Sequence, residues 1–192
     1  MNNAKEELEV KWSRFHSLVE KIDSSHPGSL NLVDEYAERL IIAPAATESI
    51  YFGAYPGGLI DLSISVTSRM RAMHKALELD TPMDSVVFTG LFHAIGLLGD
   101  ETEDLLIPQD SDWHLKRGVM YKHNERLPKM PASHRSLYIL QRAGIKLSYD
   151  EWTAISMSTG THREESRFYA GTEPQLGLLI SHARAWVTRR SE

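Results

Sequence analysis

Hydrophobic positions recur along most of the chain at the spacing of amphipathic α-helices. Apolar residues return every three or four positions, the period at which a helix buries one face. The segments with this pattern, in chain order, are residues 8–22, 33–41, 62–77, 133–142, 148–157 and 174–190. Pro44 ends the second segment, and the capping-box sequence Ser148-Tyr-Asp-Glu opens the fifth. The pattern predicts an all-α fold of about seven to nine helices of ordinary length.

Residues 82–98 form a further segment that is apolar on nearly every side. Thr81 and Pro82 supply a hydroxyl cap and a proline at the first helical position, where a missing N–H costs nothing. A helix that is apolar all round lies inside a domain, so we expect this one to be the most buried element. Polar groups are scarce in it, and His93 is therefore the residue that stands out.

Length and composition narrow the classes of function. A chain of 192 residues suits one domain with a full core, and a net charge of −5 does not indicate binding to nucleic acid or to a membrane surface. The absence of cysteine excludes disulfides, thiolate metal sites and cysteine catalysis, and fits a reducing cytoplasm. The polar, acidic N-terminus does not predict a signal peptide, and no apolar run approaches the ~20 residues of a membrane span.

Residues 93–97, His-Ala-Ile-Gly-Leu, resemble the central His-Asp-Ile-Gly-Lys motif of HD-domain phosphohydrolases. The segment that begins Ala43-Pro-Ala and continues through Gly57-Gly-Leu is similar to a phage-type branch of that family. The resemblance runs from about residue 30 to the C-terminus. It implies a single HD-type helical bundle over residues 1–192, with residues 1–29 as an N-terminal helix and turn. It also implies a phage-encoded protein in the cytoplasm of a bacterial host.

The resemblance fails at the residues that carry the chemistry of the family. Of the expected metal ligands, two histidines and two aspartates, the match keeps His93 alone. The positions that match lost ligands or substrate contacts hold Phe52, Leu62, Ala94, Ser158, Thr159 and Arg184. One imidazole does not hold a divalent cation, and the fixed charge of Arg184 would repel one. We therefore expect no metal, no cofactor and no catalytic residue, as in a pseudoenzyme.

The remaining histidines form no metal-binding motif, and we expect His26 on the surface and His93 as a core histidine that donates to a backbone carbonyl. The basic, aromatic segment 113–131 is interpreted as a solvated loop, although the branch has a similar segment near its substrate cleft. The candidate ligand-binding residues of the old cleft are His93, Arg184, Asp61, His162, Arg163 and Lys122.

Three functions from different classes remain open. The first is a non-catalytic, inhibitory module that binds a macromolecule, with a host protein as partner. The second is a metal-independent binder of a nucleotide or another anion, in which Arg184 contacts phosphate directly. The third is a phosphohydrolase with a rebuilt site that uses Asp61, Asp100 or Glu101. Neither nucleic acid nor a membrane is an expected partner, and assembly into a homo-oligomer stays open.

Arg184 is the residue that separates these hypotheses. A guanidinium buried without a partner would cost several kcal/mol. Arg184 should therefore turn to solvent, pair with Asp61, Asp100 or Glu101, or hold an anion. We favour the first two outcomes, because Phe52 and Leu62 add apolar bulk where a phosphate would sit.

Overall fold

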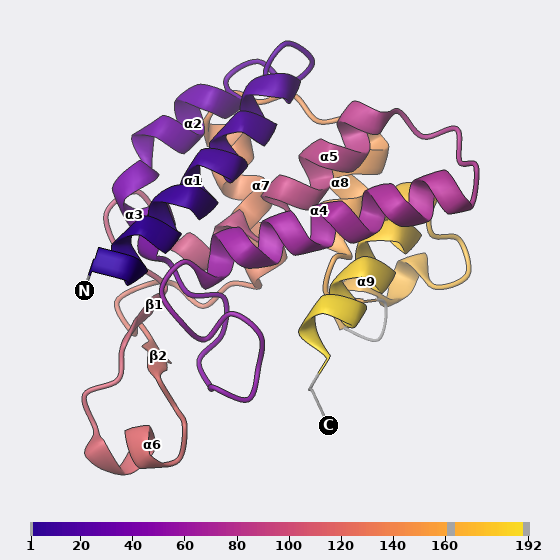
Figure 1. The fold of residues 1–192 in the computed structure, drawn as a ribbon. Helices are drawn as coiled ribbons and strands as arrows, with labels where there is room; N and C mark the ends of the chain where they lie inside the picture. Colours follow the sequence, from indigo (N-terminus) through magenta and orange to yellow (C-terminus); the bar gives the residue numbers. More distant parts are fainter. Residues whose placement is uncertain (1, 161–163, 190–192) are drawn as a thin grey trace.

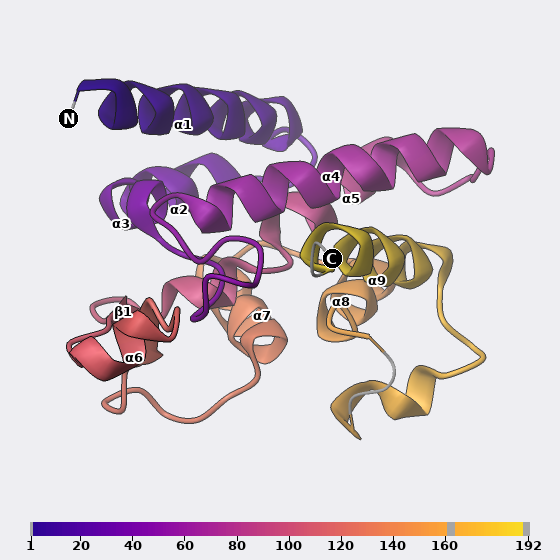
Figure 2. The same ribbon diagram turned by 60° about the horizontal axis from the view of Figure 1, so that its bottom comes forward.

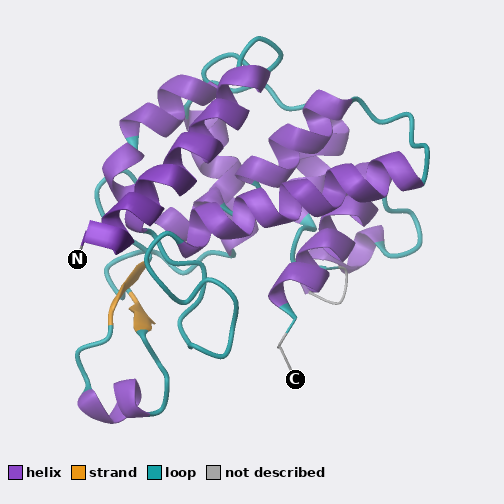
Figure 3. Cartoon of the chain, in the orientation of Figure 1, coloured by secondary structure: helices purple, strands orange, loops and turns teal. Residues whose placement is uncertain are grey.

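The computed structural model describes residues 2–160 and 164–189, and the regular secondary structure of this part of the chain is helical apart from one pair of three-residue strands (Figure 3). The all-α prediction is confirmed. The α-helices are α1 (Asn2–Ile22), α2 (Ser29–Glu35), α3 (Ala37–Ile42), α4 (Gly58–Ala76), α5 (Met83–Phe92), α6 (Asp112–Lys116), α7 (Ala132–Arg142), α8 (Tyr149–Ser156) and α9 (Gln175–Thr188). The 3₁₀ helices are η1 (Ile95–Leu98) and η2 (Glu164–Tyr169), and the strands are β1 (Leu106–Pro108) and β2 (Tyr121–His123).

Helices α4 and α5 form the centre of the bundle. Helix α4 packs against α1 on one side and against α9 on the other, and it crosses α5 (Figures 1 and 2). Every residue of α5 from Val86 to Phe92 is buried, as the sequence predicts for this segment. The crossing of the two helices is close at Gly90, where a Cβ atom would lie 2.5 Å from Thr67 Oγ1. Glycine at this position lets the two backbones approach.

The central segment is less regular than its sequence predicts. Helix α5 ends at Phe92 with His93 as its C-cap, and the chain continues after Ala94 as the 3₁₀ helix η1. At the other end, Pro82 is the N-cap itself and the Thr81 hydroxyl bonds to Gln175, so the expected cap does not form. The second predicted helix is likewise two helices, α2 and α3, which meet at Tyr36.

The helical period of the segments 148–157 and 174–190 places Trp152 and Trp186 on their apolar faces and so predicts that both are buried, but both lie on the surface. Trp152 is 44% exposed and Trp186 is 68% exposed. Trp152 lies in the first turn of α8. In α9 the buried residues end at Ala183, and Trp186 lies beyond them in the last turn of the helix.

His26, expected on the surface, is instead buried between α5 and α8. Its ring stacks on Phe88 with centroids 4.0 Å apart, and its Nε2 donates to Glu151 Oε1 at 2.8 Å. Glu151 also completes the predicted capping box of α8, accepting from the backbone N–H of Ser148. A residue near the N-terminus is therefore bonded to one 125 positions later.

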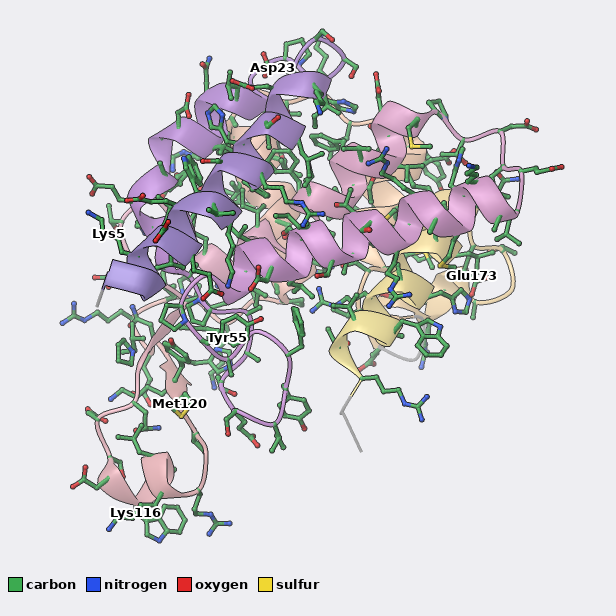
Figure 4. All side chains as sticks on the ribbon, in the orientation of Figure 1. Lys5, Asp23, Tyr55, Lys116, Met120 and Glu173 are labelled. Atoms are coloured by element: carbon green, nitrogen blue, oxygen red, sulfur yellow. The ribbon has the colours of Figure 1, made fainter. Side chains whose placement is uncertain are left out.

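A long segment between η1 and α7 extends away from the bundle. We call residues 106–123 the arm: β1 and β2 pair antiparallel at its base, and α6 lies at its outer end (Figures 1 and 3). Figure 4 shows Lys116 and Met120 on the arm, away from the helices of the bundle. The sequence predicts only a loop here, because three-residue strands are too short to show a period-two pattern.

No helix in the described ranges combines the length and the apolar character that a bilayer crossing requires.

We predict that Glu151→Gln destabilises the protein by about 1.5–3 kcal/mol at neutral pH, the usual contribution of a hydrogen bond to a charged group. Burial alone would raise the pKa of Glu151, but hydrogen bonds from His26, Ser85 and the Ser148 backbone lower it from 4.5 to about 2. Because the unfolded chain then binds the proton more tightly, the carboxylate stabilises the fold above pH 4.5 and this stabilisation is lost as pH falls towards 2.

Urea denaturation of the wild type and the variant at pH 7 and pH 3 measures both effects. The variant should lose less stability between these values than the wild type does. Ser148→Ala is the control, since it removes only the cap and should cost about 1 kcal/mol. Equal pH dependence in the wild type and in Glu151→Gln would contradict the assignment.

Candidate functional site

A cavity of about 530 Å³ opens where four separate segments meet. These segments are the loop 43–57, helix α4, the residues that follow α8, and helix α9. Its lining residues are Ala45, Ala46, Tyr51, Phe52, Leu62, Ser158, Thr159, Gly160, Ser181, Arg184, Ala185, Thr188 and Arg189. The volume lies within the ordinary range of small-molecule sites.

Five of the positions singled out by the family resemblance lie together in this cavity. They come from all four segments and are Phe52, Leu62, Ser158, Thr159 and Arg184. Leu62 is buried on α4, whereas Arg184 is half-buried on α9. The bulk of Phe52 and Leu62 does not fill the space.

His93 lies in the core beside this cavity and is 1% exposed. Its Nδ1 donates to the carbonyl of Gly90 at 2.9 Å, as expected of a core histidine, which leaves the lone pair on Nε2. Nε2 has no hydrogen-bond partner in the described chain. Burial, with the nearby charge of Arg184, lowers the pKa of His93 to about 3. The ring is therefore neutral at physiological pH.

The backbone around His93 is held by helix α7. The Ser136 hydroxyl donates to the His93 carbonyl at 2.9 Å and accepts from the Gly96 N–H at 2.8 Å. A Cβ atom on Gly96 would overlap the carbonyl oxygen of Ala132. The glycine of the His-Ala-Ile-Gly sequence thus allows η1 to dock on α7 and position His93.

The polar groups that line the cavity are hydroxyls and guanidinium groups, and no Asp or Glu is among the described lining residues. The Ser158 side chain is 1% exposed, and its Oγ has no hydrogen-bond partner among the described residues. Thr159 Oγ1 is in the same situation. Ser181 and Thr188 differ, because their hydroxyls donate to carbonyls of their own helix. The site therefore combines positive charge with two buried hydroxyls that can still bond to a ligand.

The carboxylates considered for a rebuilt site or for pairing with Arg184 lie elsewhere. Asp61, one position before Leu62 on α4, pairs with Lys11 of α1 at 2.9 Å. The Asp100 carboxylate accepts from the N–H groups of Thr102 and Glu103 in its own turn. Glu101 pairs with Arg142. None of the three acids is among the residues that line the cavity.

Two further candidates are separated from the site or lie outside the described residues. Lys122 is on β2, pairs with Asp110 at 2.6 Å, and lines a different cavity beside the arm. His162 and Arg163 lie outside the described residues. Of the six candidates, the structure places Arg184 in the cavity and His93 next to it.

Sequence reasoning missed Tyr51, Thr188 and Arg189 as lining residues. For Thr188 a signal was present: it follows Arg184 by four positions on α9, and such residues share a helix face. Tyr51 lies in an irregular loop, where no periodicity marks which side chains point inward.

The cavity does not fit the metal that the family resemblance implies. Divalent cations need several imidazole, carboxylate or thiolate donors. In the described part of the chain, no group of three or more His, Cys, Asp or Glu residues is arranged to hold a metal ion. His93 offers a single lone pair, and Arg184 places a positive charge near it.

Comparison of the chain with models of known protein families, with curated protein sequences and with solved structures gives no match.

We predict that protein purified without chelator carries far less than one equivalent of Mn, Fe, Co, Ni or Zn per chain. The reason is the shortage of donors around His93. Hydrolysis of deoxynucleotides should stay at background when Mn²⁺ or Co²⁺ is added. Elemental analysis and a phosphate-release assay measure these quantities. Stoichiometric metal that disappears in His93→Ala would contradict the prediction.

Proposed function

We propose that this chain is a non-catalytic binding protein that holds a small phosphate-bearing molecule, such as a nucleotide, in the cavity around Arg184 without a metal. The observation that supports this most is the lining itself. It brings Arg184 and Arg189 together with hydroxyl side chains, and no acid is among the described lining residues. An arginine fork matches two oxygens of a phosphate and can take the place that a cation has in an enzyme.

The buried hydroxyl of Ser158 is the second support for this proposal. A buried hydroxyl without a partner costs free energy, and a ligand oxygen that accepts its proton recovers that cost. Ser158 immediately follows α8, whose C-cap Met157 is fully buried, so its position is set by the core. The hydroxyl is therefore pre-positioned before any ligand arrives.

The rest of the cavity suits the less polar part of such a ligand. Tyr51 is 42% exposed and Phe52 half-buried on the same loop, and Leu62 lies beneath them. Aromatic faces of this kind stack on nucleobases without sequence preference. A nucleotide would thus place its phosphate at the arginines and its base against the loop.

Because the cavity is open, we rank the binding of a small molecule above hydrolysis and above binding on the outer surface alone. Hydrolysis in this family needs metal ligands, and the described lining residues provide neither imidazole nor carboxylate. A filled cleft would favour binding on the outer surface alone, but about 530 Å³ is open at this point.

We predict that nucleoside monophosphates bind in the presence of EDTA, and more tightly than inorganic phosphate does. Arg184→Ala should weaken binding by about tenfold or more, because a hydrogen bond to a charged group contributes about 1.5–3 kcal/mol. Isothermal titration calorimetry with both ligands measures the change. Arg69→Ala, an exposed arginine elsewhere on α4, is the matched control and should bind like the wild type.

Two results would contradict this proposal. One is nucleotide binding that is unchanged in Arg184→Ala. The other is the absence of binding to any member of a panel that includes mono- and triphosphates of all bases.

A second candidate function, binding of a host protein, is favoured by the arm. Helix α6 has no buried residue, and Trp113 at its start is 60% exposed. The Arg117 guanidinium lies over the Trp113 ring, 4.5 Å from its centroid. Exposed Trp and Arg side chains are enriched among the residues that dominate protein interfaces.

We predict that a bacterial protein captured by the tagged chain is lost in Trp113→Ala, because that change removes the largest apolar surface of the arm. Trp186→Ala is the matched control, since Trp186 is similarly exposed but lies on α9. Quantitative mass spectrometry of the captured proteins provides the measurement. The same captured set for the wild type and for Trp113→Ala would reject this role of the arm.

A further inference from the structure

A second, larger cavity lies between the base of the arm and the start of α7. Its volume is about 1030 Å³, and it shares no described lining residue with the cavity around Arg184. Apolar side chains line much of it, among them Leu97, Leu105, Ile107 and Leu127. Leu105 and Leu127 belong to a small hydrophobic cluster that is separate from the main core. This surface is therefore a preformed apolar pocket outside the helical bundle.

Arg135 lies in the wall of this pocket and is only 4% exposed. One nitrogen, Nη2, donates to the carbonyl of Pro128 at 2.7 Å. Its Nε, also buried, has no partner, and Arg135 forms no ion pair with an acid among the described residues. A buried guanidinium that keeps its charge is costly unless an anion or several acceptors satisfy it.

The lining of the pocket carries more cations than acids: Lys122, Arg126 and Lys129 lie there with Arg135, and Glu125 is the only Asp or Glu in the described lining. Lys122 pairs with Asp110, and Arg126 pairs with Glu103. Residues 113–135 contain six Lys or Arg and one acid, although the whole chain has a net charge of −5. The described lining of the pocket therefore carries a net positive charge, which attracts an anion.

We propose that this pocket binds a small organic anion with an apolar body, such as a medium-chain carboxylate. The carboxylate pairs with the Arg135 guanidinium, whose planar fork fits two oxygens. The apolar body covers the partly exposed Leu97, Ile107 and Met130, which removes their surface from water. A strongly hydrophilic anion would satisfy the arginine and leave these side chains exposed to water, and a neutral hydrocarbon would do the reverse.

This inference is independent of the phosphate-binding proposal, because the two pockets share no described lining residue. Arg184→Ala should leave the binding of the carboxylate unchanged, and Arg135→Met should leave the binding of the nucleotide unchanged. Failure of one proposal is therefore distinguishable from failure of the other.

The test compares decanoate with decanol, which has the same chain and no charge. Calorimetry at submicellar concentrations should show decanoate binding at least tenfold more tightly than decanol. Arg135→Met should remove this preference, since methionine keeps much of the apolar volume and lacks the charge. Arg69→Ala is the control for a general change in surface charge, and it should bind decanoate like the wild type.

Amide shifts in NMR spectra locate the probe, and they should cluster at Leu105 and Leu127. The melting temperature of Arg135→Met should equal or exceed that of the wild type, because the change removes an unpaired buried charge. If that variant fails to fold, Arg135→Lys replaces it: the charge stays, the fork is lost, and decanoate binding should weaken. Equal affinity for decanoate and decanol, no decanoate binding, or shifts that map to the Arg184 cavity would each overturn the proposal.

Discussion

The hydrogen bond between His26 and Glu151 is the constraint on which the arrangement of the bundle depends most. It joins the turn after α1 to the first turn of α8, and its imidazole stacks on Phe88 of the most buried helix. Three elements far apart in sequence are thereby fixed at one point. Ser158 and Thr159 follow the other end of α8, a helix that this contact helps to hold in place. The packing of the core therefore helps to position two of the residues that line the cavity around Arg184.

Much of the fold could be predicted from periodicity, because each major helix buries one apolar face. The errors have specific causes. The sequence predicts a surface position for His26 because its partner, the Glu151 carboxylate, is 125 positions away, and no local pattern indicates so distant a contact. Trp152 and Trp186 fit the helical period of the apolar positions, but they lie in the terminal turns of α8 and α9, where they stay exposed. Periodicity indicates which face of a helix is apolar and not how far along the helix that face is covered.

The candidate site could be predicted in part. The resemblance selected six replaced positions, and the structure brings five of them, from four segments, into one cavity. It gave no information on whether the space would be open, because that depends on how Phe52 and Leu62 pack. No sequence pattern marks Arg135 as a buried residue, for a related reason. Its burial arises from the path of residues 124–131, an irregular segment whose course a sequence pattern does not describe.

The loop that carries Tyr51 and Phe52 is bonded to the arm through its backbone. Thr47 accepts from the N–H groups of Met120 and Tyr121, and Ser49 donates to the Gly118 carbonyl at 2.7 Å. The rim of one cavity and the projecting arm are therefore joined by backbone hydrogen bonds. A ligand on the arm that shifted this junction would change the affinity of the Arg184 cavity for its own ligand, and the reverse effect would have the same size.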